Sequence, residues 1–341
     1  MKRIKITIIT STIILLTLIF SLNSEVVTSS IKFSIKLCYN SVIPSLFPFF
    51  ILCEFLMLTI GGAFTNTTLM AFSTSLITGF PTGIKNVCSL YENRDIDKTT
   101  AVSLLHCTAN ASPAYIVSFI GGCILKDRTS GLILLISQFF CALSCSVFFG
   151  CFKIRNQKRR VSGVINVTDA ACKSISDSVI SCIYVCGYIT FFGLIADIFI
   201  DIGIPDIIAR LLFFLPSNAV KSVSIGFIEI TRGLMMTESD NIVIAAIITS
   251  FSGISVIMQC INCTIKSRLP SVPVISGKIA YTLVMPVMAV FLEKLIPKSH
   301  APHETTYSPF VSFVIFILFI SFCIILIYNI FDKSSKRIYN K

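Results

Sequence analysis

Long apolar runs follow one another along the chain, and short polar or charged segments separate them. The first run covers residues 6–22 and follows Met-Lys-Arg-Ile-Lys. It resembles a secretory signal, but no small-x-small cleavage site follows it and much more apolar sequence does, so we expect an uncleaved first span. Because strands of membrane barrels alternate apolar and polar residues, these continuous runs predict helices.

The later runs divide the chain into two similar halves. Residues 26–40 are moderately amphipathic, and apolar runs then cover 41–60, 69–90, 100–124 and 130–152, followed after a basic segment by 169–200, 207–236, 240–263, 277–295 and 309–330. We expect an all-α polytopic membrane protein with about 8–10 membrane segments, some of them interrupted or re-entrant. The predicted units are an N-terminal transmembrane helix (1–25), a first repeat (26–152), a basic linker (153–168), a second repeat (169–296), and an outside loop, last helix and basic tail (297–341).

Composition supports a membrane protein. The 341 residues are 54% hydrophobic and 13% charged, against about 25% charged in an average soluble domain. Soluble, fibrous and disordered classes are therefore excluded. The net charge of +11 is interpreted as a topology signal rather than as nucleic-acid binding, because basic clusters mark the N-terminus, residues 153–160 and the C-terminal tail.

The basic clusters predict the orientation of the halves. The positive-inside rule places all three in the cytoplasm. The first half then starts outside and ends inside at residue 153, and the second half starts inside and ends outside near residue 300. The two halves would be inverted-topology repeats, which are typical of secondary transporters.

Each half contains two stretches too broken for a simple span. Residues 79–83 (Gly-Phe-Pro-Thr-Gly) correspond to 226–233, and 110–113 (Asn-Ala-Ser-Pro) correspond to 250–255. One such break is explained by a kink that lets helices pack closely. Two matched pairs favour a transport site, because unpaired backbone at membrane depth requires a surrounding cavity or protein.

Two cations lie at equivalent positions in these breaks. Lys85 is six residues after Gly79, and Arg232 is six residues after Gly226. Together they would suit an anion, particularly a dicarboxylate. The alternative is that each reaches an interface or pairs with an acid such as Glu54 or Glu229. The other predicted substrate-binding residues are Gly79, Pro81, Thr82, Gly83, Asn110, Ser112, Gly226, Glu229, Thr231, Ser252 and Ser255.

Signatures of other chemistry are missing. The sequence has no nucleophile elbow, P-loop or zincin motif, so we expect no enzyme, cofactor or metal. Cys141 and Cys145, and likewise Cys182 and Cys186, are four apart, but no histidine is near either pair, and buried cysteines behave as small apolar residues. Glu229 is the candidate to take up a coupling proton or ion.

Several motifs resemble a known family. They are Ile-Pro-Ser-Leu-Phe-Pro-Phe-Phe at 43–50, Gly-Phe-Pro-Thr-Gly-Ile-Lys at 79–85, Asn-Ala-Ser-Pro at 110–113, Gly-Phe-Ile-Glu-Ile-Thr at 226–231 and Ser-Phe-Ser-Gly-Ile-Ser at 250–255. In this order, and over about residues 30–295, the chain resembles the sporulation integral membrane protein YlbJ family. Each half resembles the nucleoside recognition or gate domain, which also occurs in concentrative nucleoside transporters. Phe80 and Thr82 depart from the tyrosine and valine common in the family.

The resemblance implies a role in endospore formation: passage of dipicolinate, a rigid dianion, across the outer forespore membrane, which supports the spore cortex. Two alternatives stay open, namely an ion-coupled nucleoside carrier and a sporulation scaffold that transports nothing. The expected partners are a small anionic substrate, the lipid bilayer and a coupling ion (proton or sodium), with a second copy of the chain as a further candidate and no nucleic acid.

Overall fold

The computed structural model describes residues 2–59, 67–151, 166–238 and 241–296. Within these ranges every regular element is a helix and none is a strand. The predicted all-α class is therefore confirmed for this part of the chain. The basic segment 153–160 and the predicted outside loop, last helix and tail at 297–341 lie outside the described residues.

The first half follows the predicted apolar runs closely. Its elements are α1 (Lys2–Leu22), α2 (Ser24–Leu37), the π-helix η1 (Cys38–Val42), α3 (Ile43–Thr59), α4 (Thr67–Thr78), α5 (Thr82–Glu92), α6 (Lys98–Leu105), the π-helix η3 (Tyr115–Ile124) and α7 (Arg128–Phe148). Acidic side chains start two of them: Asp97 accepts from Thr100 N, and Asp127 accepts from Thr129 N and Ser130 N. Such caps satisfy amide groups that the first helical turn leaves unpaired.

The second half has a similar order of elements. It comprises α8 (Val167–Asp201), α9 (Ile204–Leu211), α10 (Ser217–Gly226), α11 (Ile230–Met235), α12 (Ile242–Phe251), α13 (Gly253–Lys266) and α14 (Val272–Leu295). In the first half one break follows α4, a second follows α6, and the long helix α7 ends the half. In the second half the breaks follow α10 and α12, and the long helix α14 ends the half. The order of elements agrees with two repeats, and their inverted relation stays a prediction.

Four described helices are long and apolar enough to cross a membrane. They are α7, α8, α12 continued by α13 (Ile242–Lys266), and α14; α1 with α2 and η1 forms a fifth candidate that is bent by 91°. The chain is thus an integral membrane protein by the length and composition of its helices. Large apolar side chains are exposed along several of these helices, for example Leu283, Val287 and Phe291 on α14, as lipid contact requires.

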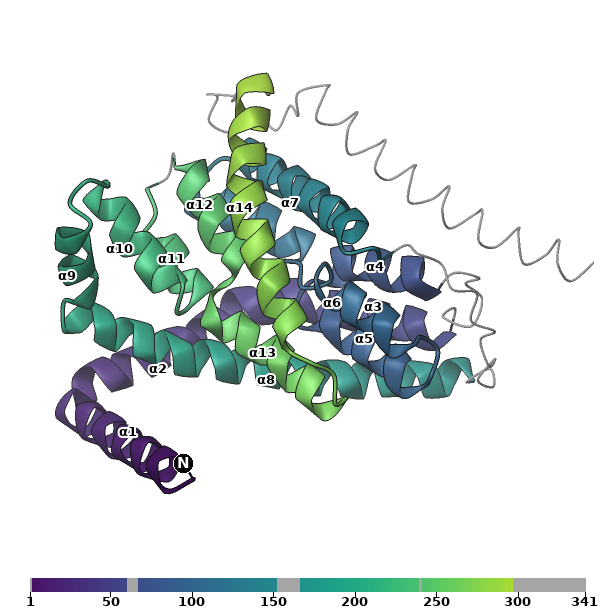
Figure 1. The fold of residues 1–341 in the computed structure, drawn as a ribbon, viewed down its shortest axis with the longest axis horizontal. Coiled ribbons are helices and arrows are strands. Elements are labelled where there is room, and N and C mark those ends of the chain that lie inside the picture. Colours follow the sequence, from purple (N-terminus) through teal and green to yellow (C-terminus); the bar gives the residue numbers. More distant parts are fainter. Residues whose placement is uncertain (1, 60–66, 152–165, 239–240, 297–341) are drawn as a thin grey trace, which may run out of the picture.

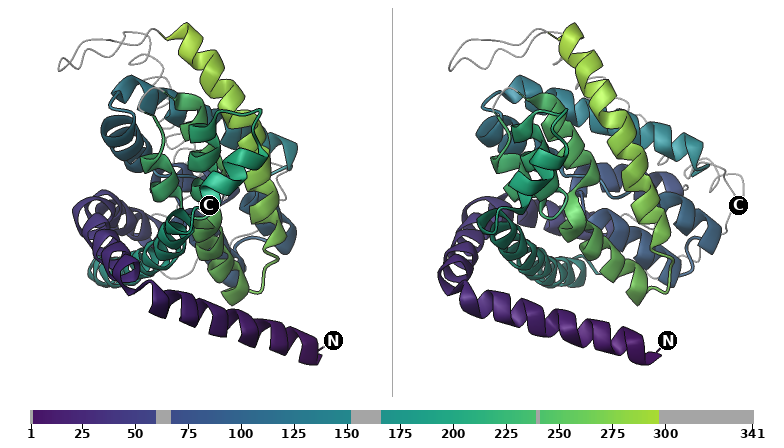
Figure 2. Two further views of the ribbon diagram at one scale, coloured as in Figure 1. Left: turned by 90° about the vertical axis from the view of Figure 1, so that its left-hand side faces the viewer. Right: turned by 60° about the vertical axis from the view of Figure 1, so that its left-hand side comes forward.

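Two layers of helices make the body of the molecule. The long helix α8 packs along α2 and α3, where Cys38, Val42, Phe50 and Val185 belong to a small buried cluster. The larger core contains residues from α4–α7 and from α11–α14, so both halves contribute to it. Figure 1 shows α14 crossing the front of this core, with α8 running beneath it and α1 lying apart. Figure 2 shows the same separation of α1 from the body in both views.

Candidate functional site

The two breaks of the first half touch each other. Phe80 N donates to Asn110 O at 2.6 Å, so the first break is bonded to the second. Gly79 has a φ of +74°, and a Cβ there or at Gly83 would overlap backbone atoms of Ser112 or Thr108. These two positions require glycine because the breaks cross at backbone contact. A kink that lets helices pack closely and a transport site would both bring the two breaks this close together.

Neighbouring side chains bind the second break from two sides. Gln138 on α7 accepts from Ala111 N and donates to Ala111 O, both at 2.9 Å. Asn110 Nδ2 donates to Cys107 O at 3.0 Å and to Ser75 Oγ at 3.3 Å. Both backbone groups of Ala111, and the carbonyl oxygens of Cys107 and Asn110, are therefore paired inside the protein, as membrane depth demands.

The breaks of the second half also meet. Ile254 N donates to Phe227 O at 2.8 Å, and Ser255 N donates to Ile228 O at 3.1 Å. A Cβ at Gly253 would lie 2.9 Å from Gly226 O. The correspondence of the breaks that the sequence suggested thus extends to their contacts, because in each half the first break is hydrogen-bonded to the second.

Contacts between the halves centre on the same breaks. The hydroxyl groups of Tyr115 on η3 and Thr231 on α11 share a hydrogen bond of 3.2 Å. On α14, Tyr281 donates to Asn110 Oδ1 at 3.0 Å, and Gly277 lies so close that a Cβ would overlap His106 O. The helix α14 therefore joins the second half to the break at 110–113.

A buried lysine lies among these contacts. Lys278 is 3% exposed, and its Nζ donates to Ser252 Oγ at 2.7 Å. The same Nζ lies 5.4 Å from the centre of the Phe80 ring and 5.9 Å from that of Tyr281. Within the part of the chain that the structure describes, no carboxylate lies at ion-pair distance from it.

Arg232 is neutralised by an acid that the sequence did not suggest. Its Nε and Nη2 donate to the two carboxylate oxygens of Asp197 on α8, both at 2.8 Å, and Nη2 also donates to Ser34 Oγ on α2 at 3.0 Å. The guanidinium lies 4.1 Å from the centre of the Phe33 ring. Glu229, proposed as its partner, instead caps α11 by accepting from Arg232 N at 2.8 Å.

Two polar atoms remain unpartnered beside this ion pair. Glu229 Oε1 and Arg232 Nη1 are buried without a hydrogen bond of standard geometry within the described residues, and the N–H and hydroxyl groups of Thr231 are the donors beside the Glu229 carboxylate. A buried carboxylate oxygen without a donor is unfavourable unless a proton or an ion occupies it.

Lys85 lies elsewhere, in the wall of a cavity of about 330 Å³ between α5, α8 and α13. Its Nζ is 3.6 Å from Glu54 Oε2, and the lysine side chain is 34% exposed. Pro81 and Lys266 also line this cavity, as do the acids Glu92 and Asp177. In this conformation Lys85 therefore has the acidic partner given as the alternative to anion binding.

Polar side chains continue from the breaks towards this cavity. Thr82 and Asn86 on α5, and Ser255 and Gln259 on α13, are each spaced by one helical turn and are buried. Each has a side-chain polar atom with no hydrogen-bond partner in the structure. The two helices pack against each other, and Gln259 lines the cavity.

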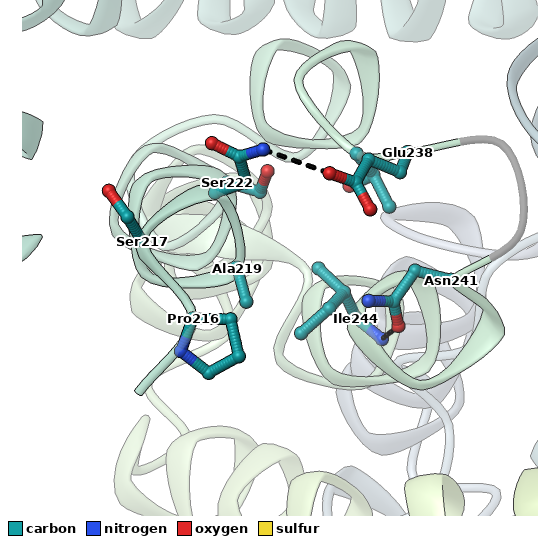
Figure 3. Close-up of a pocket in the computed structure, with 9 residues that line it drawn as sticks. Pro216, Ser217, Ala219, Ser222, Glu238, Asn241 and Ile244 are labelled. Carbon is teal, nitrogen blue, oxygen red and sulfur yellow. Dashed lines mark hydrogen bonds between the residues drawn. The ribbon is translucent and has the colours of Figure 1, made fainter. Parts of the chain in front are cut away.

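A second cavity of about 210 Å³ lies between α10 and the start of α12 (Figure 3). Asn218 Nδ2 donates to Glu238 Oε1 at 2.9 Å, as the dashed line in Figure 3 marks. Asn241 Oδ1 accepts from Ile244 N at 3.1 Å. No Lys, Arg or His is among the described residues that line it, so this cavity does not suit an anion.

The predicted site residues fall into three groups. Gly79, Gly83, Asn110, Ser112, Gly226, Ser252 and Ser255 lie at the crossing breaks; Glu229, Thr231 and Arg232 lie on or beside α11; Pro81 and Lys85 line the cavity, and Thr82 connects it to the breaks. The predicted pair of cations does not share one cavity: Lys85 lines its cavity and pairs with Glu54, whereas Arg232 pairs with Asp197 and does not line that cavity.

Sequence analysis missed three residues that hold the site together: Lys278, Asp197 and Gln138. A signal existed for Lys278, because a lysine inside the apolar run 277–295 is rare and marks a functional candidate. Asp197 similarly interrupts the apolar run that ends near residue 200. Comparison of the chain with models of known protein families, with curated proteins and with solved structures gives no match.

Proposed function

We propose that the protein is a membrane transporter of a small organic anion, with dipicolinate as the substrate that the family resemblance suggests. The supporting observation is the meeting of two pairs of broken helices between the halves, with buried polar atoms that have no partner. Broken helices at corresponding places in two halves are the usual site of substrate binding in secondary transporters. The proposal includes the inverted repeats predicted from the basic clusters.

The cavity between α5, α8 and α13 is the proposed entrance for the anion. Lys85 and Lys266 are the positive charges at its wall, beside the acids Glu92 and Asp177. The ion pair of Lys85 with Glu54 is partly exposed, and such pairs contribute little to stability. An entering carboxylate therefore competes easily for Lys85.

Glu229 is the proposed site of the coupling ion. Its Oε1 is buried without a hydrogen bond of standard geometry, while Oε2 stays bonded to Arg232 N. A proton or sodium ion bound at Oε1 would remove the unfavourable burial of that oxygen. Arg232, fixed on Asp197, orients α11 rather than binding the anion in this conformation.

Uptake of labelled dipicolinate by vesicles that contain the purified protein tests the proposal. We expect uptake above that of empty vesicles, and a rise when a proton or a sodium gradient is imposed. Lys85→Gln should lower the initial rate about tenfold, as expected for losing a charge that attracts the anion. Lys221→Gln, which changes a lysine paired with Asp206 away from the cavity, is the matched control.

Two results would contradict the proposal. Uptake of nucleosides in place of dipicolinate would identify a nucleoside carrier, whose neutral substrate needs no lysine at the entrance. Absence of any uptake by correctly inserted protein, with loss of sporulation on surface substitutions alone, would identify a scaffold.

A further inference from the structure

We propose that Lys278 binds a carboxylate group of the transported anion, in a site completed by the hydroxyl groups of Thr82 and Ser255. The inference rests on the proposed function and names the group that recognises its substrate. It starts from a cation that is 3% exposed and has no carboxylate at ion-pair distance among the described residues.

The surroundings of Lys278 compensate its charge only in part. An ammonium group has three donors, and one of them is used on Ser252 Oγ. The rings of Phe80 and Tyr281 lie at cation–π distance, which is weaker than pairing with a carboxylate. Charged groups buried in membrane proteins usually pair with each other or lie on a substrate pathway. The other three buried or half-buried cations among the described residues, Arg232, Lys85 and Lys221, do have acidic partners.

The starts of two helices adjoin this lysine. Lys278 Nζ lies over the ring of Phe80, which comes two residues before α5 begins. Nζ also donates to Ser252, which immediately precedes α13. The helices have 11 and 14 residues, and the amino ends of helices carry partial positive charge that favours an anion. At the start of α13, Ile254 N and Ser255 N already donate to Phe227 O and Ile228 O. A carboxylate beside Lys278 would thus be favoured there by the helix dipole and not by free amides.

Unpartnered hydroxyl groups lie in the first turn of each of these helices. Thr82 is the first residue of α5, and Ser255 is the third residue of α13. Both are buried, and neither side-chain oxygen has a hydrogen-bond partner in the structure. A carboxylate accepts hydrogen bonds from hydroxyl groups, so it would satisfy both and the remaining donors of Lys278.

A polar track links the site to the cavity. One turn beyond Thr82 and Ser255 lie Asn86 and Gln259, which also have unpartnered polar atoms. Gln259 lines the cavity that contains Lys85. The anion would enter at Lys85 and move along α5 and α13 to Lys278.

The test measures the KM of dipicolinate uptake by vesicles. Lys278→Met should raise the KM about 30-fold or more, as expected when one partner of a buried charge pair is removed, while Lys278→Arg keeps the charge and restores much of the affinity. Thr82→Val and Ser255→Ala should each raise the KM about fivefold. Lys221→Met is the control on a half-buried lysine that pairs with Asp206 away from the site, and its KM should equal that of the unchanged protein.

A wild-type KM for Lys278→Met would overturn the inference. If that variant does not insert, Thr82→Val and Ser255→Ala decide the inference, because they remove only hydroxyl groups that make no hydrogen bond in the structure. An unchanged KM in both variants would overturn it. Failure of the unchanged protein to take up dipicolinate contradicts the proposed function instead. The inference is then decided by the rise in Tm that dipicolinate causes in the unchanged protein. A rise that is abolished in these variants supports the inference. No rise in the unchanged protein, or an equal rise in the variants, overturns it.

Discussion

At the scale of single residues, the site depends on glycines placed where backbones cross. At Gly277 a Cβ would overlap His106 O, whereas at Gly187 on α8 it would meet no atom within 4 Å. The obstacle at Gly277 is a backbone atom, which cannot turn aside as a flexible side chain does. Two glycines in long helices therefore differ completely in what they tolerate.

Gly277→Ala should destabilise the protein by about 1–3 kcal/mol, because α14 must shift away from the break that it binds. The shift would also lengthen the hydrogen bond from Tyr281 to Asn110. Gly187→Ala is the matched control and should be neutral or stabilising by up to about 1 kcal/mol, since alanine favours the helix. Thermal unfolding in detergent measures both, and equal Tm values for the two variants would contradict the expectation.

At the scale of elements, Arg232 joins three helices. From the short helix α11 it binds Asp197 on α8 and Ser34 on α2. Its bidentate geometry with Asp197 fixes direction as well as distance. The broken region of the second half is thereby attached to the layer made by α2, α3 and α8.

Asp197→Asn should destabilise the protein by about 3 kcal/mol or more, because the guanidinium stays buried without an opposite charge. Changing both partners to apolar residues, Arg232→Met with Asp197→Leu, should recover much of that loss. The control is Asp206→Asn, which changes a partly exposed ion pair with Lys221 and should have little effect. Tm values compare the four proteins, and an unaffected Asp197→Asn would show that this link is not structural.

At the scale of the whole molecule, the arrangement agrees with two related halves. Contacts of α5 with α13 and of η3 with α11 join the halves at their breaks. The helices α5 and α11 each follow the first break of their half, and η3 and α13 each follow the second. The contact of α5 with α13 is therefore the counterpart of the contact of α11 with η3. An inverted relation of the halves would place the junction near residues 152–165 on the same side as the C-terminal tail.

Epitope tags test that orientation. A tag inserted after residue 155 and one at the C-terminus should both be reached by antibody only after the membrane is permeabilised, because both follow basic clusters. A tag inserted after residue 302 should be reached without permeabilisation. Tags at residue 155 and at the C-terminus on opposite sides would exclude the inverted arrangement, and tagged proteins that keep normal expression serve as the control for correct insertion.

Much of the fold was predictable from the order of residues. The apolar runs predicted where helices lie, because spanning helices must be apolar whatever surrounds them. Of the about 8–10 predicted membrane segments, four or five are matched by described helices long and apolar enough to span. The positions of the breaks were also predictable, since Pro81, Gly79 and Pro113 disrupt local backbone geometry. The pairing of Lys85 with Glu54 was foreseen as an alternative, and the structure confirms it.

The sequence by itself thus determined the class of protein, the helices and the interrupted segments, because these follow from local backbone chemistry and hydropathy. Only the tertiary structure decided the partners: Asp197 for Arg232, Gln138 for the break at 110–113, and Ser252 for Lys278. These contacts join residues 26–35 positions apart, on separate elements. Such pairings depend on how helices cross, which hydropathy and local propensity do not encode.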